Sequence, residues 1–167
     1  TSSSLGSSDE PGLDPLGDPA TRFLLERAAL APDNLEHNPI LRGALIGHIN
    51  AALELAKKAS IAVYGVGEIS ERSSLYKTGY MNPELLGELL ASGAVGDICG
   101  HFFNIQGNIC LPHVENRTLA IDLDSLKKIP VCMAVAGGIS KKSAILGMLA
   151  GKLCNVLVTD EETALLM

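Results

Sequence analysis

Tryptophan is absent from this sequence, and only 4% of its 167 residues are aromatic. Apolar residues still make up 47% of the chain. We therefore expect a core of leucine, isoleucine, valine and alanine, the usual filling of parallel sheets covered by helices. No apolar run approaches the roughly 18 residues needed to span a bilayer, and the N-terminus lacks the basic segment and apolar stretch of a signal peptide. These absences predict a soluble, cytoplasmic protein without a membrane partner.

A surplus of basic residues is also missing, because the formal net charge at pH 7 is −6. A domain that binds DNA phosphates by itself normally carries a basic face, so we do not expect this chain to bind nucleic acid unaided. The histidines show no spacing typical of a metal site or a catalytic triad. The cysteines form no CxxC pair and no Cys/His cluster with metal-ligand spacing. We therefore predict no metal, no cofactor and four structural thiols, at Cys99, Cys110, Cys132 and Cys154.

The first part of the chain is rich in serine, glycine, proline and aspartate and has few large apolar residues up to about residue 18. Such a segment cannot offset the entropy cost of becoming ordered. We predict a flexible tail over residues 1–18, followed by one domain over residues 19–167. Helical periodicity begins with Ala20–Leu30, and a second helix is predicted from Pro39, after the N-cap residue Asn38, to near Lys57 and Lys58.

After this helix, short apolar runs alternate with amphipathic segments. The pattern predicts buried strands over Ile61–Val66, Val95–Phe103, Val131–Ala136 and Asn155–Thr159. It predicts helices over Asn82–Leu90, Leu123–Lys128 and Ser140–Ala150, and a last helix capped by Asp160. Strands separated by helices favour an α/β fold, here a three-layer, Rossmann-like parallel sheet flanked by helices. The stretch Val95–Leu111 could add an antiparallel pair at one edge.

In sheets of this kind, ligands bind beyond the carboxyl ends of the strands, and the loop after Val131–Ala136 carries the clearest signal. Gly137 and Gly138 allow the backbone to approach a ligand closely, and the next helix presents free N–H groups and the positive end of its dipole. Ser140 adds a hydroxyl group and Lys141 a cation. This combination is typical of a phosphate site, although the spacing is not that of a Walker loop. The alternative is a simple turn with a solvated lysine.

Other strand ends offer weaker candidates. Gly65 and Gly67 follow a predicted strand, but the third glycine of a dinucleotide-binding fingerprint is missing. Asp97 lies in an apolar stretch and needs partners for its charge, either sugar hydroxyls or backbone N–H groups. Asp160 and the acidic residues after it are more typical of a helix cap than of a metal site. Arg72 could lie over a ligand, with a solvated position as the alternative.

Four strings occur in a fixed order between Ala31 and the end of the chain: YGVG at residues 64–67, GAVGDICG at 93–100, AVAGGISK at 134–141 and LVTDEETA at 157–164. In order and spacing they resemble the effector-binding domain of the SorC family of sugar-responsive transcriptional regulators. The resemblance implies a fold similar to that of sugar-phosphate isomerases and deaminases, used as a sensor. It also implies a phosphorylated sugar as effector, and homo-oligomers whose affinity for DNA depends on it.

The resemblance also implies roles for individual residues. By matching position, Gly137, Gly138 and Lys141 would hold the phosphate, with Ser140 next to them. Asp97 would bond sugar hydroxyls, and the loop from Gly65 to Gly67 would frame the pocket. No catalytic residue is expected, although Asp97 is the candidate base if the chain is instead a related isomerase- or deaminase-like enzyme. A second alternative is an oligomerisation domain that has lost its ligand.

Two features of the family are not found in this sequence. Members begin with a helix-turn-helix domain, so we expect DNA binding only through such a domain on the N-terminal side of this chain. The effector domain of the family also has an early strand and loop that contribute to its pocket. A start rich in serine, glycine and proline stands in their place, which predicts an effector domain without its N-terminal portion.

Overall fold

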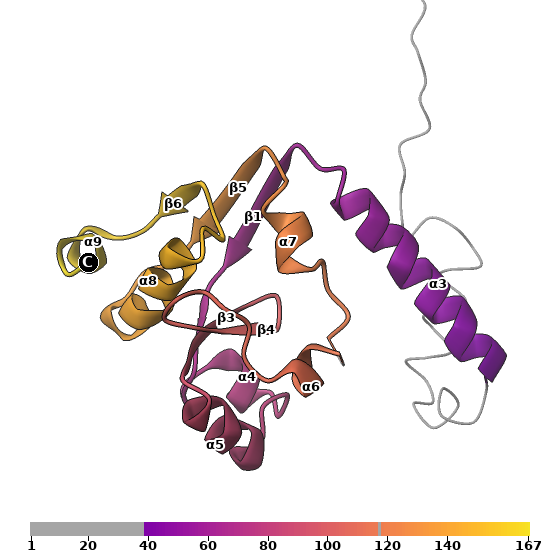
Figure 1. Cartoon of the computed structure of the whole chain (residues 1–167), viewed down its shortest axis with the longest axis horizontal. Coiled ribbons are helices and arrows are strands. Elements are labelled where there is room, and N and C mark those ends of the chain that lie inside the picture. The colour runs from indigo at the N-terminus through magenta and orange to yellow at the C-terminus, as the bar shows by residue number, and fades with distance from the viewer. Residues whose placement is uncertain (1–38, 117) are drawn as a thin grey trace, which may run out of the picture. The chain divides into compact units, whose positions relative to one another are not determined.

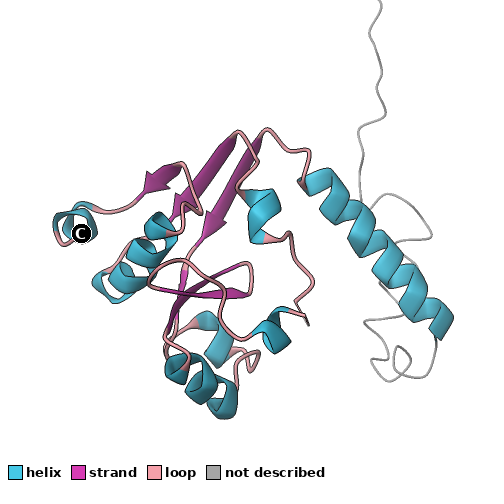
Figure 2. Cartoon of the chain, viewed as in Figure 1, coloured by secondary structure: helices cyan, strands magenta, loops and turns pink. Residues whose placement is uncertain are grey.

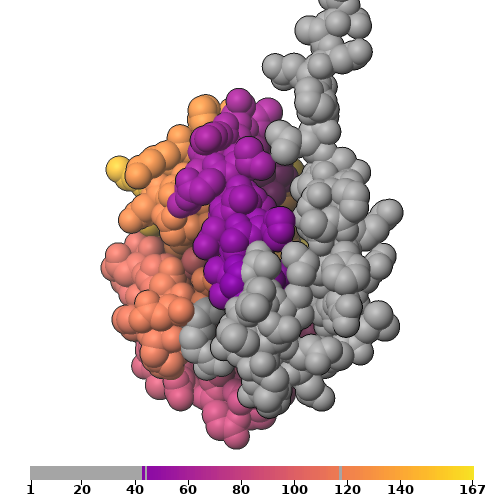
Figure 3. All heavy atoms as spheres, turned by 90° about the vertical axis from the view of Figure 1, so that its right-hand side faces the viewer, coloured from indigo at the N-terminus to yellow at the C-terminus, as the bar shows by residue number. Residues whose placement is uncertain are grey.

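The computed structural model describes residues 39–116 and 118–167 (Figures 1 and 2). Within helix α3 it does not describe the side chains of residues 39–42 and 44, which are grey in the space-filling view of Figure 3. The tail predicted over residues 1–18 and the helix predicted over Ala20–Leu30 lie outside the described residues. The chain divides into two compact units, Thr1–Ala52 and Leu53–Met167.

Helix α3 spans Pro39–Ala56 and runs across the boundary between the two units. Proline at the first helical position suits its missing N–H group and its fixed φ angle. Just after the last turn, the ammonium group of Lys57 lies 2.8 Å from a carboxylate oxygen of Glu54. The predicted helix from Pro39 to near Lys57 is thereby confirmed.

Three strands form a parallel sheet in the order β1-β5-β6. They are β1 (Ile61–Gly65), β5 (Val131–Val135) and β6 (Val156–Val158). All three are short and rich in β-branched residues, which pack well on a pleated surface. They confirm three of the four predicted strands and the prediction that these strands run parallel.

A second, antiparallel sheet has the order β2-β3-β4, with β2 at Gly67–Glu68, β3 at Ala94–Ile98 and β4 at His101–Asn104. The prediction of one continuous strand over Val95–Phe103 is wrong. The chain reverses at Cys99 and Gly100, whose φ angles are 54° and 84°. A two-residue hairpin turn of this hand matches the twist of its flanking strands. An antiparallel pair is present, but it lies within Ala94–Asn104 and belongs to a separate sheet, not to an edge of the parallel sheet as suggested.

Six further α-helices lie in the described part of the second unit. They are α4 (Ser74–Lys77), α5 (Pro83–Ala91), α6 (Pro112–Glu115), α7 (Leu123–Leu126), α8 (Lys142–Ala150) and α9 (Glu161–Leu165). The side chain of Asn82 accepts a hydrogen bond from the N–H of Leu85 at 2.9 Å, which caps α5 as predicted. The helix predicted from Ser140 starts instead as a short 3-10 turn, η1 (Ile139–Lys141), which leads into α8.

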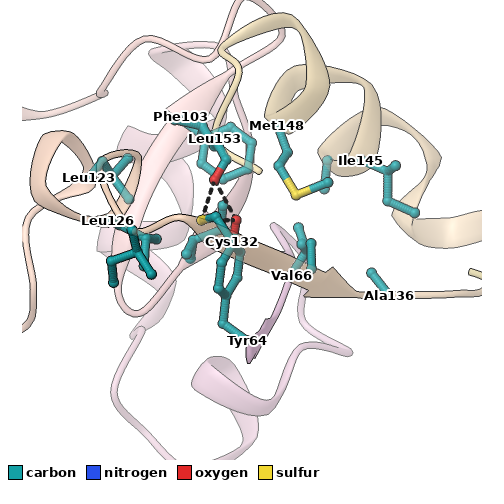
Figure 4. Packing of buried hydrophobic residues seen from close by; sticks show 14 residues of the cluster. Tyr64, Val66, Phe103, Leu123, Leu126, Cys132, Ala136, Ile145, Met148 and Leu153 are labelled. Carbon is teal, nitrogen blue, oxygen red and sulfur yellow. Dashed lines mark hydrogen bonds between the residues drawn. The ribbon is translucent and has the colours of Figure 1, made fainter. Parts of the chain in front are cut away.

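The antiparallel sheet separates two clusters of buried apolar residues, because consecutive residues of a strand point to opposite faces. Phe102 packs with Leu86 and Leu89 of α5 in the smaller cluster. Phe103 belongs to the larger cluster. In that cluster, Ile145 and Met148 of α8 lie on the same side as Val66 and Ala136 (Figure 4). In the same cluster the hydroxyl group of Tyr64 donates a hydrogen bond to the carbonyl oxygen of Leu153 (Figure 4).

The two faces of the parallel sheet differ in exposure. Tyr64, Cys132 and Ala134 point into the larger cluster and are buried. On the opposite face, Ile61 is 59% exposed and Val63 is 63% exposed. The predicted α/β class and the parallel sheet are therefore confirmed. A layer of helices on both faces of the sheet stays a prediction.

Candidate functional site

A cavity of about 470 Å³ lies beside the point where the chain passes from β1 to β2. Its walls come from this crossing, from the loop before α4 and the start of α4, from β3 and from η1. The parallel and the antiparallel sheet thus both contribute to it. Its lining residues are Gly65, Val66, Gly67, Glu68, Arg72, Ser73, Ser74, Leu75, Asp97, Ser140 and Lys141.

Five of the seven residues proposed from the sequence line this one cavity: Gly65, Gly67, Asp97, Ser140 and Lys141. They are separated by up to 76 residues along the chain (141 − 65). Gly65 is the last residue of β1, and Gly67 pairs with Asp97 across the antiparallel sheet. Ser140 and Lys141 belong to the 3-10 turn η1. The fold therefore brings together side chains that the sequence could only nominate one loop at a time.

The other two candidates, Gly137 and Gly138, are not among the residues that line the cavity. The N–H of Gly138 donates to a carboxylate oxygen of Asp160 and to the hydroxyl oxygen of Thr163, both at 2.8 Å. A Cβ atom on Gly137 would collide with the same carboxylate. This pair of glycines therefore contacts the β6–α9 loop, and its amide at Gly138 is already engaged.

Asp160 caps α9, as predicted, because its carboxylate also accepts a hydrogen bond from the N–H of Thr163 at 2.8 Å. These N–H groups and the Thr163 hydroxyl hold the pKa of Asp160 below its usual range, with the Thr163 amide as the largest cause. One carboxylate thus caps the last helix and fixes the turn that precedes Lys141.

Asp97 is only 8% exposed. Burial raises the pKa of its carboxyl group, and the N–H of Gly100 and the positive charge of Lys141 partly oppose that rise. The Gly100 N–H lies 3.4 Å from Oδ2, which is a long hydrogen bond. Gly67 has room for no side chain, since a Cβ atom there would overlap with Oδ1 of Asp97. The glycine is therefore required for Asp97 to occupy its place in the cavity wall.

The structure adds two charged residues to the candidates proposed for the site. Glu68 lines the cavity, and its Oε1 atom accepts a hydrogen bond from the Ser70 hydroxyl at 2.8 Å. Arg72, for which both a ligand contact and a solvated position were considered, lies in the cavity lining. A signal for both existed, because they follow directly after the Gly65–Gly67 crossing. Their charges alone could not distinguish a cavity wall from a solvated loop.

His101 supports the hairpin next to Asp97. It is only 2% exposed, its Nδ1 atom lies 2.9 Å from both carboxylate oxygens of Glu115, and its Nε2 atom lies 2.9 Å from the carbonyl oxygen of Ile121. Both ring nitrogens lie within hydrogen-bond distance of oxygen atoms. The histidine thus connects β4 to α6 and to the segment before α7.

The cavity is lined by charged and hydroxyl-bearing side chains. It combines the cations of Arg72 and Lys141 with the carboxylates of Glu68 and Asp97 and with serine hydroxyls. Over residues 39–116 and 118–167, no group of three or more His, Cys, Asp or Glu side chains is placed to hold a metal ion. None of the helices described there combines the length and apolarity needed to cross a bilayer.

Comparison with known proteins shows which family the chain resembles. Residues 27–167 match the model of Sugar-bind, a family of sugar-binding domains. The chain is 42% identical over 117 residues to the deoxyribonucleoside regulator of Bacillus subtilis, an alignment that covers 70% of this chain and 37% of the regulator.

Solved structures show the same likeness. A DeoR family transcriptional regulator from Listeria monocytogenes matches with a TM-score of 0.68 and 31% identity, over 71% of this chain and 48% of that one. The full-length sorbitol operon regulator SorC from Klebsiella pneumoniae matches with a TM-score of 0.66 and 29% identity, over 77% of this chain and 42% of that one.

The fold and the family match together define a sugar-binding domain of transcriptional regulators. This chain belongs to the sugar-binding domain family of the DeoR, SorC and LsrR regulators. Its curated relatives are regulators and not enzymes, which argues against the isomerase- or deaminase-like alternative. The chain spans 37% of the B. subtilis regulator and 42% of the Klebsiella sorbitol operon regulator.

Proposed function

We propose that this chain is the effector-sensing domain of a cytoplasmic bacterial regulator and that its effector is a phosphorylated sugar. The observation that carries the proposal is the convergence of Asp97, Ser140 and Lys141 on one cavity together with Arg72. Cations suit a phosphate group, and a buried carboxylate suits hydroxyl donors. The relatives include a deoxyribonucleoside regulator and a sorbitol operon regulator, and their names support a carbohydrate-related ligand.

Lys141 is the proposed main anchor of the phosphate. Its positive charge acts on the carboxyl groups of both Glu68 and Asp97, which places the charge at the cavity. Ser140 and the backbone of η1 would add further donors. Because the N–H of Gly138 is bonded to Asp160 and Thr163, we assign Gly137 and Gly138 the role of holding the turn in shape beside the phosphate.

Regulation would require two domains, one that binds the effector and one that binds DNA. With a net charge of −6, this domain is a poor partner for DNA phosphates, so we assign DNA binding to a separate helix-turn-helix domain. The domain would assemble as a homo-oligomer, and the effector would change the affinity of the assembly for DNA. We also propose that further helices cover the exposed face of the parallel sheet in the longer protein, because parallel sheets are normally covered on both faces.

The test compares Lys141→Ala with Lys142→Ala by isothermal titration calorimetry, using a panel of pentose and hexose phosphates and their unphosphorylated forms. A charge-assisted hydrogen bond contributes roughly 1.5–3 kcal/mol, so Lys141→Ala should weaken binding about ten- to a hundredfold. Lys142 follows Lys141 directly and is not a lining residue, so its removal should have a small effect. Equal losses in both variants, or no preference for phosphorylated sugars, would show that this loop does not bind the phosphate.

A further inference from the structure

Glu68 occupies a position between two neighbouring cavities. The second cavity, of about 410 Å³, shares three lining residues with the first: Glu68, Arg72 and Ser140. The backbone of Glu68 is fixed, because β2 pairs with β3 in the register Glu68–Gly96. Its carboxylate is held as well, through the 2.8 Å hydrogen bond from Ser70 to Oε1. Glu68 is therefore a fixed part of the wall and not a mobile surface side chain.

The charges around the two cavities are balanced within the protein itself. Arg72 and Lys141 are cationic, and Glu68 and Asp97 carry carboxyl groups. The two carboxyl groups differ in behaviour. Burial raises the pKa of Asp97, whereas the hydroxyls of Ser140 and Ser70 and the charges of Lys141 and Arg72 lower the pKa of Glu68. The neighbours of Glu68 thus stabilise its negative charge, whereas burial disfavours that of Asp97.

An anion that enters this cavity meets two opposing influences. Arg72 and Lys141 attract it, while the carboxylate of Glu68 repels it. A ligand that carries hydroxyl groups can donate hydrogen bonds to the Glu68 carboxylate, because a carboxylate has about four acceptor positions. Hydrogen bonds from hydroxyl groups to a charged acceptor are stronger than those to a neutral one. Inorganic phosphate at neutral pH has only one or two hydroxyl groups, and they sit on the charged group itself, so a hydrogen bond from them to Glu68 brings the two negative charges together.

We infer that Glu68 is a specificity-determining residue that accepts hydrogen bonds from the hydroxyl groups of the effector and keeps inorganic phosphate out of the cavity. The inference rests on the proposed function and deepens it, because it specifies the ligand as an organic phosphate that carries hydroxyl donors close to its phosphate group. A regulator with this device does not respond to the free phosphate that accompanies sugar phosphates in a cell.

The test measures the Kd of the whole chain for inorganic phosphate and for ribose 5-phosphate by isothermal titration calorimetry at pH 7.5. The variant is Glu68→Gln, which keeps the shape of the side chain and removes its charge. The matched control is Glu71→Gln, because Glu71 lies in the turn that follows β2, is exposed and lines neither cavity. Circular dichroism checks that both variants fold as the parent does.

Glu68→Gln should bind inorganic phosphate more tightly than the parent, on the order of tenfold. It should bind ribose 5-phosphate no more tightly, so that the preference for the sugar phosphate falls by about the same factor. Glu71→Gln should leave both Kd values unchanged. A gain in phosphate affinity cannot result from damage to the fold, which separates this role from a structural one.

Equal affinity of the parent and Glu68→Gln for inorganic phosphate would overturn the inference, as would an equal gain in Glu71→Gln. The proposed function fails in a different way, namely if the parent binds ribose 5-phosphate and the other sugar phosphates of the panel no better than their unphosphorylated forms. In that case the inorganic phosphate titrations still decide whether Glu68 repels anions, and the hydroxyl-accepting part of the inference falls with the proposed function.

Discussion

Two glycines in helices make opposite predictions for the same substitution. Gly147 lies inside α8 and Gly87 lies inside α5. A Cβ atom at Gly147 would lie 2.7 Å from the carbonyl oxygen of Asn104 and 3.0 Å from a methyl group of Val95. A Cβ atom at Gly87 would meet nothing within 4 Å. At Gly87, alanine can therefore stabilise the helix through its higher helix propensity. At Gly147, the added methyl group must displace β4.

The expected magnitudes follow from these distances. In a helix interior, alanine is about 1 kcal/mol more favourable than glycine, so Gly87→Ala should stabilise the chain by about that amount. Gly147→Ala gains the same helix propensity. The atom closest to its new methyl group, however, is the backbone carbonyl oxygen of Asn104, which cannot rotate away. Overpacking of this kind costs about 1–3 kcal/mol, and we expect the upper end because the neighbour is backbone. The net result is a loss of roughly 2 kcal/mol, about 3 kcal/mol below Gly87→Ala.

Urea unfolding followed by far-ultraviolet circular dichroism measures both values, with the slope of the transition checked for constancy. The comparison is internal, because both changes have the same effect on the unfolded chain. If Gly147→Ala stabilised the chain as much as Gly87→Ala does, α8 would not pack against β4 in the way described here. The reasoning about the position of Lys141 would then fall too, because η1 leads directly into α8.

Two further predictions concern the hairpin that carries Asp97. His101→Ala should lower the free energy of unfolding by about 3 kcal/mol. The reason is that it leaves the partly buried carboxylate of Glu115 and the carbonyl of Ile121 without their partner. A loss below about 1 kcal/mol, measured by urea unfolding, would contradict this role of His101. Asp97→Asn should raise the melting temperature of the ligand-free chain at pH 7 and weaken sugar-phosphate binding. Because burial raises the pKa of Asp97, the contribution of this group to stability is present below the ordinary value of 3.8 and is lost as the pH rises through the higher folded-state value. The gain in melting temperature from Asp97→Asn should therefore disappear in acid. A scanning calorimetry series in which this gain persisted at low pH would refute the stated effect of burial on Asp97.

Local signals in the sequence were sufficient for most of the regular structure. The N-cap at Asn82 predicted the start of α5, and Asp160 predicted the start of α9, because capping depends on atoms three residues away. The short β-branched runs predicted β1, β5 and β6. Their parallel pairing followed from the helices between them, since sequence order limits how such strands can be connected.

The errors concern features that local patterns do not encode. The run Val95–Phe103 is mostly apolar, and its periodicity shows no break at Cys99 and Gly100. A hairpin turn needs positive φ angles at both positions, and Cys99 is not one of the residues typical of that conformation. Asp97 consequently lies within an antiparallel strand and not in a loop after a parallel one.

The sequence by itself determined the family, the α/β class and five of the residues that line one cavity, because short strings in a fixed order are sufficient for these. Only the tertiary structure decided that Gly138 bonds to Asp160 rather than facing the cavity, and that Glu68 and Arg72 belong to its wall. These outcomes depend on contacts between distant segments, such as the 22 residues that separate Gly138 from Asp160. The physical reason is that charge and hydrogen-bonding capacity can be read from a residue, whereas its partners are fixed only when the chain has packed.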